Sequence, residues 1–204
     1  MLTKGVLVVT RVLGGNKFIN LSYFRKMSQC AATAKRALVF LAPGAEEMEF
    51  VVAADVLRRG GINVIIAGLP DGSLVKCSRD VNIQPDISVA EAKSKAMAAS
   101  KEVGELLKEQ EKAGRVIAAI CAAPTALKAH GVAVGKNVTS YPAMKPEMEE
   151  GGKYNYQECN VVVDGNIITS RGPGTAFDFA LKIVDKIVGK EKASEVAKAM
   201  LLSY

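Results

Sequence analysis

Short apolar runs that alternate with helical stretches constrain the fold of this chain most strongly. Residues 37–42 form a continuous apolar run that ends at a Pro-Gly pair, as expected of a strand buried on both faces of a parallel sheet. Residues 46–59 carry apolar side chains at helical spacing and stop at two glycines, and residues 62–67 give a second apolar run. Such strand–helix–strand units predict an α/β fold, with helices on both faces of a parallel sheet.

Later segments extend this pattern to the end of the chain. Residues 116–120 form another apolar strand, and residues 160–163 and 166–170 flank an Asp-Gly turn, which predicts a β-hairpin at the edge of the sheet. Residues 175–188 and 191–202 carry apolar side chains at helical spacing. These two segments are predicted to be packing or dimer helices.

Composition narrows the class of protein. The 204 residues, 49% of them hydrophobic, suit a single core. No apolar run approaches the ~20 residues that a membrane-spanning helix needs, so we expect no membrane association. The cysteines lack any C-x-x-C pair and there is one histidine, which predicts neither a disulfide scaffold nor a metal site but a reducing compartment.

The net charge of +6 is concentrated near the N-terminus. Residues 1–45 contain seven basic residues and no acidic one, whereas the rest is about neutral and has no nucleic-acid motif. We therefore expect no direct nucleic-acid partner. Residues 1–34 are predicted to be a basic extension before a single domain of residues 35–204. This extension has the composition of a mitochondrial transit peptide, and the alternative is a tail without targeting function.

Cys121 stands where an apolar strand runs into a helix start, followed by two alanines and Pro124. This order is typical of a nucleophile elbow, a tight turn that presents one side chain above the sheet. Amide N–H groups and the helix dipole would lower the pKa of the Cys121 thiol there. The alternative is a buried, unreactive cysteine.

The residues alone offer more than one candidate for the general acid or base. His130 lies nine residues beyond Cys121 on the same predicted helix, ~13 Å along its axis, so a Cys–His pair is disfavoured. Glu46, Glu47 and Glu49 follow the first strand, at the edge where parallel strands converge on a ligand. Carboxylates are also favoured at a helix start for their charge alone.

Four segments together resemble the Parkinson disease protein 7 family, over about residues 35–190. They are residues 44–49 (Gly-Ala-Glu-Glu-Met-Glu), 77–80 (Cys-Ser-Arg-Asp), 118–127 (Ala-Ala-Ile-Cys-Ala-Ala-Pro-Thr-Ala-Leu) and 169–175 (Thr-Ser-Arg-Gly-Pro-Gly-Thr). The resemblance implies a flavodoxin-like three-layer sandwich with a mostly parallel sheet. It also implies that the protein forms a homodimer and that its activity needs no cofactor.

The same resemblance assigns the site residues. It makes Cys121 the oxidisable nucleophile and Glu49 the protonated carboxyl that hydrogen-bonds the sulfur. Tyr141 stands where the family often has a histidine, so any role of that imidazole is lost or altered here. The expected pocket consists of Arg79, Ala122, Tyr141, Arg171, Gly172 and Pro173.

Two functions follow from the resemblance. The first is cysteine-dependent detoxification of reactive dicarbonyls such as methylglyoxal, free or as early adducts on glycated proteins, by a glyoxalase or deglycase that protects against oxidative stress. The alternative is a non-enzymatic redox sensor or chaperone, regulated by oxidation of Cys121. Either would work in the cytoplasm, in mitochondria or in both.

One segment departs from the family pattern. Family members have an apolar strand ending in Pro-Gly-Gly before the cysteine strand, whereas residues 88–114 here are predicted to form one long helix that starts at a capping box. We therefore predict that one central strand is missing, as a splice variant or an imperfect gene model would give. The expected result is a weaker enzyme and a less stable fold.

Overall fold

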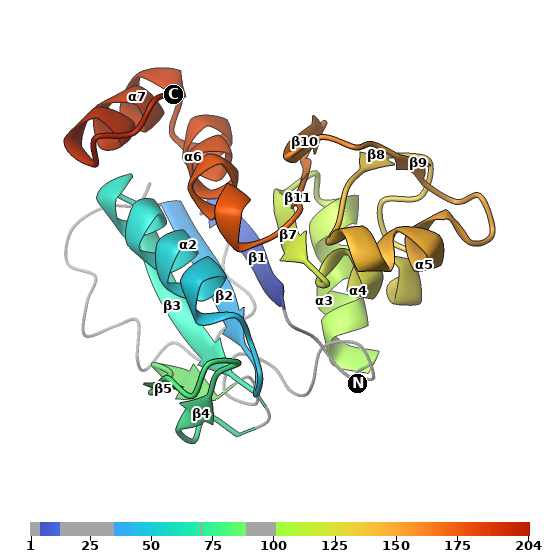
Figure 1. The fold of residues 1–204 in the computed structure, drawn as a ribbon, viewed down its shortest axis with the longest axis horizontal. Helices are drawn as coiled ribbons and strands as arrows, with labels where there is room; N and C mark the ends of the chain where they lie inside the picture. Colours follow the sequence, from blue (N-terminus) through green and yellow to red (C-terminus); the bar gives the residue numbers. More distant parts are fainter. Residues whose placement is uncertain (1–4, 13–34, 70, 89–100) are drawn as a thin grey trace.

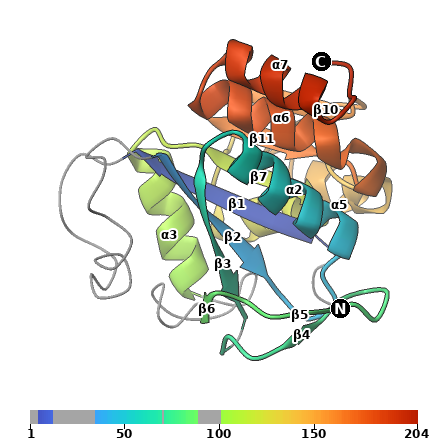
Figure 2. The ribbon, with the colours of Figure 1, turned by 90° about the vertical axis from the view of Figure 1, so that its left-hand side faces the viewer.

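A computed structural model describes residues 5–12, 35–69, 71–88 and 101–204. Its centre is a seven-stranded sheet in the order β10-β11-β7-β1-β2-β3-β6 (Figure 1, and Figure 2 for β6). Strands β11, β7, β2, β3 and β6 run in one direction, and β1 and β10 run in the other. The strands are β1 (Gly5–Val12), β2 (Lys35–Leu41), β3 (Asn63–Gly68), β6 (Ile87–Ser88), β7 (Ile117–Cys121), β10 (Val161–Asp164) and β11 (Ile167–Ser170).

Helices cover both faces of this sheet (Figure 2). One core cluster joins one face to α2 (Glu47–Arg59), α6 (Ala176–Ile187) and α7 (Lys190–Ala199). The opposite cluster joins the other face to α3 (Lys101–Lys112), α4 (Pro124–His130) and α5 (Lys145–Glu149). The predicted three-layer α/β sandwich with a mostly parallel sheet is confirmed. Short elements complete it: β4 (Val75–Lys76) with β5 (Asn82–Ile83), β8 (Asn137–Val138) with β9 (Asn155–Tyr156), η1 (Pro142–Met144) and η2 (Pro173–Thr175).

Strand β1 is buried on both faces. Val6 and Val8 point into the cluster with α2 and α6, and Leu7 and Val9 point into the cluster with α3 and α4. These four side chains are at most 4% exposed. The alternation follows from the period of two along a strand, so one short segment contributes to both halves of the core.

The position of β1 differs from the sequence-based expectation. Residues 5–12 were predicted to lie in an extension outside the domain, and a central strand was predicted to be missing. The structure places β1 between β2 and β7, antiparallel to both, with Val8 opposite Val39 and Ala118. The physical reason is that β2 and β7 would otherwise face each other with unpaired backbone groups, which an apolar extended segment satisfies. Residues 13–34 lie outside the described part of the chain.

Other predicted elements are found with small shifts at their ends. The β10–β11 hairpin turns at Gly165, whose φ is +63°, and places β10 at the edge of the sheet. The predicted helix start at Ser88 is wrong, because Ser88 pairs with Gly68 as the last residue of β6. Of the long predicted helix, α3 is described, whereas residues 89–100 lie outside the described residues. None of the helices in the described ranges is long and apolar enough to cross a bilayer.

Candidate active site

Cys121 occupies a strained turn between β7 and α4. Its φ is +65°, in the left-handed region that costs a non-glycine residue roughly 1–3 kcal/mol. Two backbone hydrogen bonds hold the turn: Ala123 N–H donates to the Ile120 carbonyl at 3.1 Å, and Tyr141 N–H donates to the Cys121 carbonyl at 2.8 Å. The predicted nucleophile-elbow geometry is therefore present, with Cys121 at the carboxyl end of its strand.

Glu49 lies on the first turn of α2 and is fully buried. A Cβ on Gly172 would lie 3.9 Å from Glu49 Oε1 and 3.6 Å from Tyr141 Cδ2, so these three residues meet. Neither carboxyl oxygen of Glu49 has a standard hydrogen bond within the described residues. The Cys121 side chain is the polar group that interacts with this carboxyl. Of the three candidate carboxylates, Glu49 is therefore the one whose side chain interacts directly with Cys121.

Burial governs the protonation of this pair. Burial raises the pKa of Glu49 to about 8, against a smaller lowering by the Cys121 side chain. Burial, followed by the charge and hydrogen bond of Glu49, raises the pKa of the Cys121 thiol, against a smaller lowering by the Ala122 N–H. The predicted lowering of the Cys121 pKa is therefore not found. Two adjacent buried acids resist ionising together, so the pair retains a proton at neutral pH.

Glu47 and Glu46 have a different environment from Glu49. Ser78 Oγ lies 2.8 Å from a carboxyl oxygen of Glu46 and 2.9 Å from one of Glu47. Arg79 N–H donates to Glu47 Oε1 at 2.7 Å. These contacts fasten the β4–β5 loop to the start of α2. Arg79 is exposed there, and its guanidinium donates to the Ser78 carbonyl. The hydrogen bonds of Arg79 within the described residues are therefore with this loop and with Glu47, and not with the Cys121 turn.

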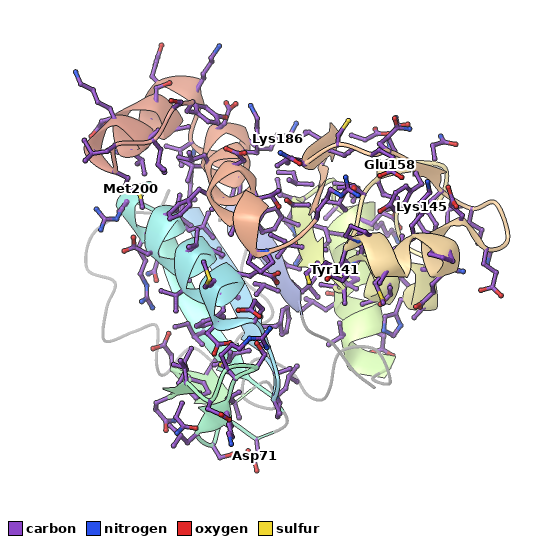
Figure 3. All side chains as sticks on the ribbon, in the orientation of Figure 1. Asp71, Tyr141, Lys145, Glu158, Lys186 and Met200 are labelled. Atoms are coloured by element: carbon purple, nitrogen blue, oxygen red, sulfur yellow. The ribbon has the colours of Figure 1, made fainter. Side chains whose placement is uncertain are left out.

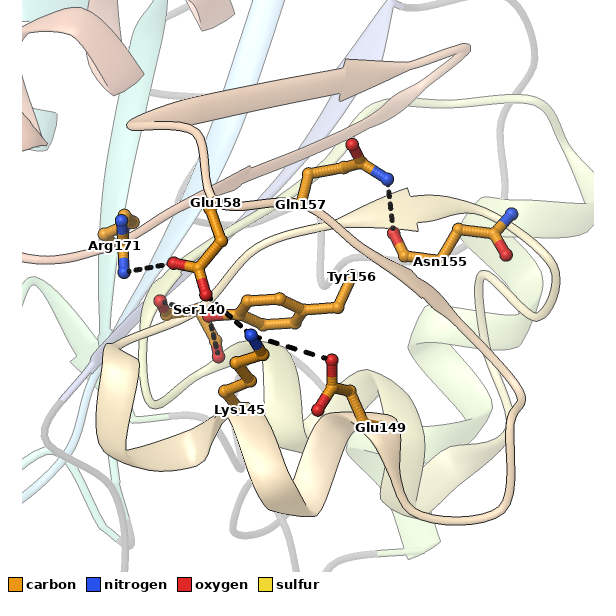
Figure 4. A network of polar contacts seen from close by, with 8 residues as sticks. All are labelled: Ser140, Lys145, Glu149, Asn155, Tyr156, Gln157, Glu158 and Arg171. Carbon is orange, nitrogen blue, oxygen red and sulfur yellow. Dashed lines mark hydrogen bonds and ion pairs between the residues drawn. The ribbon is translucent and has the colours of Figure 1, made fainter.

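A polar network holds Arg171, the residue before Gly172, in place (Figure 4). Glu158 accepts from Lys145 Nζ at 2.7 Å and from Arg171 Nη2 at 3.0 Å. Lys145 Nζ also lies 5.5 Å from the centre of the Tyr156 ring. Glu158 therefore ties α5 to the residue that precedes Gly172. Figure 3 shows Tyr141 on the same side of the molecule as Lys145 and Glu158.

The turn after Arg171 is itself held by hydrogen bonds. Thr175 Oγ1 lies 3.1 Å from Gly172 N and 2.6 Å from Ser170 Oγ, and Pro173 begins η2. Gly172 is buried while Arg171 and Pro173 are half-buried. Of the predicted site residues, the structure thus joins Cys121, Glu49, Ala122, Tyr141 and Gly172, with Arg171 and Pro173 beside them and Arg79 on the β4–β5 loop.

Sequence reasoning missed part of this site. Lys145 and Glu158 are 13 residues apart, and no local spacing links them because the fold alone brings their loops together. Gly5, the first residue of β1, lies opposite Cys121 in the sheet and was assigned to the extension. His130 is the last residue of α4 and packs against Gly104 of α3. The described residues contain no group of three or more His, Cys, Asp or Glu side chains placed to hold a metal ion.

These features define a class: a three-layer α/β protein with a cysteine on a nucleophile elbow and a buried carboxyl beside it. The model of the DJ-1/PfpI family matches residues 35–186. The chain therefore belongs to the DJ-1/PfpI family, which confirms the resemblance seen in its motifs.

Known relatives match most of the chain. Protein dj-1beta of Drosophila melanogaster is 56% identical over 185 residues, covering 83% of this chain and 98% of the relative. Its crystal structure matches with a TM-score of 0.78, over 82% of this chain and 97% of that one. The Parkinson disease protein 7 homolog of Danio rerio is 48% identical, covering 82% and 97%. The glutathione-independent glyoxalase DJR-1.2 of Caenorhabditis elegans is 43% identical, covering 84% and 99%.

The alignment lengths can be compared with the prediction that one strand of the family is missing from this chain. The match to dj-1beta spans 185 positions but covers 83% of 204 residues, which is about 169. The relative therefore contributes about 16 positions that have no counterpart in the matched part of this chain. This difference is long enough for a strand and its turn.

Proposed function

We propose that this protein is a cysteine-dependent enzyme of the glyoxalase or deglycase type, acting on reactive dicarbonyls or on their early adducts with proteins. The observation that carries the proposal is Glu49, a buried carboxyl beside Cys121 with its pKa raised to about 8. A general acid–base group works best when its pKa lies near the working pH. A relative named as a glutathione-independent glyoxalase supports the same chemistry.

In the first step, Cys121 Sγ adds to the aldehyde carbon of the dicarbonyl. Because the Cys121 pKa is raised, the sulfur enters the reaction as a thiol whose proton leaves as the carbon–sulfur bond forms. Ionised Glu49 accepts this proton and passes it to the aldehyde oxygen, giving a hemithioacetal. The buried site disfavours a free thiolate but favours this transfer between neighbours.

In the second step, Glu49 moves the proton from the hemithioacetal carbon to the adjacent carbonyl carbon. The hydroxyl proton moves at the same time to the former ketone oxygen, so that one carbon is oxidised while its neighbour is reduced. Water then cleaves the resulting thioester, which releases a 2-hydroxyacid and restores the thiol. The sum is dicarbonyl plus water giving hydroxyacid, with no cofactor consumed.

Methylglyoxal consumption by the purified full chain tests the proposal. We expect turnover with release of lactate, and no turnover above background for Cys121→Ser, because the hydroxyl is a far weaker nucleophile at this site. Cys159→Ser is the matched control, since Cys159 is exposed and far along the chain. Loss of activity in both variants, or in neither, would refute the assignment.

A redox sensor or chaperone is the second candidate function. The observation that favours it is that both Glu49 oxygens lack a standard partner among the described residues. A protonated Glu49 could donate to an oxygen of a Cys121 sulfinate. If the full chain shows no dicarbonyl turnover but peroxide converts Cys121 to a stable sulfinate, this alternative replaces the enzyme.

We also propose a homodimer that covers the exposed apolar residues of α2. Met48 and Val51 are 57% and 50% exposed, one helical turn apart. Val51→Glu is expected to shift the protein to a monomer in light scattering, because it places a charge in the apolar contact. Leu201→Glu, at a site that is 95% exposed near the C-terminus, should leave the mass unchanged. A monomeric parent chain would overturn the proposal.

A further inference from the structure

The beginning of β1 lies against the turn that carries Cys121. In the register of the sheet, Gly5 is opposite Cys121 and Val6 is opposite Ile120. A Cβ on Gly5 would lie 2.5 Å from Ala123 N and 2.7 Å from the Ile120 oxygen. Contacts this short do not occur between a Cβ and backbone atoms, so only glycine allows this approach.

The atoms that Gly5 approaches are those that shape the elbow. The Ile120 carbonyl accepts from Ala123 N–H and closes the turn. The Ala122 nitrogen, whose N–H acts on the Cys121 sulfur, would lie 3.1 Å from the same Cβ. Displacement of the turn by a side chain at position 5 would therefore move the amide that faces the sulfur.

We propose that Gly5 is a positioning residue for Cys121, and that the N-terminal strand thereby sets the reactivity of the thiol. Close packing of Gly5 on the Ala122–Ala123 peptide holds the elbow in the geometry that the left-handed Cys121 backbone requires. Only the consequence for turnover rests on the proposed function. The effect on the sulfur is a property of the fold and can be measured without a dicarbonyl.

Alkylation of the full chain by iodoacetamide, followed across pH by peptide mass spectrometry, tests the proposal. Exposed Cys159 serves as the internal reference in the same molecule. In Gly5→Ala, the Cys121 rate relative to Cys159 is expected to fall about tenfold at pH 7, because one hydrogen bond to the ionised sulfur is weakened. The pH profile should move upward by about one unit.

Val9→Ala is the control for general weakening of β1. Val9 is opposite Ile117, four residues from Gly5 and ~13 Å along the strand. This variant should lower thermal stability but leave the ratio of Cys121 to Cys159 alkylation and its pH profile unchanged. An unchanged ratio in Gly5→Ala, or an equal fall in Val9→Ala, would overturn the proposal.

A matched pair of valines keeps the test decisive if Gly5→Ala does not fold. Val6 and Val9 are both buried in β1, and Val6 lies next to Gly5. Val6→Ala is then expected to lower the alkylation ratio roughly threefold more than Val9→Ala, since it loosens the end of the strand that touches the elbow. Equal ratios would count against the proposal. A failed dicarbonyl assay together with the expected alkylation result would refute the enzyme and leave Gly5 in its role.

Discussion

Val8→Asp is expected to abolish cooperative folding of the protein. Val8 is fully buried at the centre of β1, opposite Val39 of β2 and Ala118 of β7. The substitution removes a buried valine, which loses about 1.5–3 kcal/mol of stabilisation. It also buries a carboxyl without a partner, which costs several kcal/mol more. Together these costs approach the whole stability of an ordinary domain, about 5–15 kcal/mol. Circular dichroism during thermal melting would show the loss of the transition.

Val163→Asp is the matched control for this prediction. Val163 belongs to β10, the edge strand of the same sheet, and is 47% exposed. An aspartate there remains solvated, so the melting temperature should change little. If Val8→Asp melted like the control, β1 would not occupy the centre of the sheet, and residues 5–12 would lie outside the domain as the sequence suggested.

The position of β1 has a consequence for the fate of the N-terminal segment. A transit peptide is removed after import, whereas residues 5–12 fill a slot in the sheet. Cleavage near residue 34 would leave β2 and β7 without a partner between them, so the processed and unprocessed forms cannot have the same sheet. Mitochondrial targeting by residues 1–34 thus remains a prediction that conflicts with β1 in a stable mature fold.

Local sequence patterns predicted individual strands and the hairpin correctly wherever the segment itself had a recognisable pattern. The apolar runs that became β2, β3 and β7, and the hairpin of β10 and β11, all show strand period or turn chemistry. The central place of β1 could not be predicted in this way. Its Gly-Val-Leu-Val-Val segment is apolar, but the basic residues around it matched a targeting segment, and strand order depends on which edges remain unpaired.

The site, like the fold, could be predicted from the sequence only where a local pattern marked it. The strand–Cys–Ala–Ala–Pro order identified the elbow at Cys121, and the resemblance selected Glu49. The protonation of the pair was not predictable, because a helix start suggested a lowered pKa while burial, which raises it, depends on the assembled core. The support of Arg171 by Glu158 likewise depends on loops that are distant in the sequence.

Glu49→Gln is expected to stabilise the protein at alkaline pH while it abolishes the proposed dicarbonyl turnover. Burial raises the pKa of Glu49 to about 8 from an ordinary value of 4.5. Between these values the unfolded chain has released the proton that the folded chain retains, so the free energy of unfolding falls as pH rises. The difference between the two pKa values corresponds to a loss of about 5 kcal/mol in the free energy of unfolding, which is nearly complete at pH 8 and constant at higher pH. Glutamine is neutral at every pH and lacks this penalty.

Activity should change in the opposite direction. Without an ionisable group, position 49 can neither accept the thiol proton nor return a proton to carbon, a loss of about 10²–10⁴ in rate. Glu47→Gln is the matched control two residues away. Burial tends to raise the pKa of Glu47, but hydrogen bonds from the backbone, Ser78 and Arg79 outweigh burial and hold this pKa below its usual range. That carboxylate stabilises the fold above its unfolded pKa, so its replacement should lower stability at neutral pH.

Urea unfolding of the parent chain and both variants, at intervals from pH 5 to pH 9, separates these effects. The stability of Glu49→Gln relative to the parent should be smallest at pH 5 and should increase up to pH 8, because the substitution removes the titration of Glu49. Dicarbonyl turnover measured on the same samples should be lost in Glu49→Gln and retained in Glu47→Gln. A pH-independent stability difference for Glu49→Gln would show that Glu49 ionises normally in the folded protein. Glu49 would then be a much weaker base for the thiol proton than a carboxyl with a pKa near the working pH, and the proton transfers assigned to it would need another group.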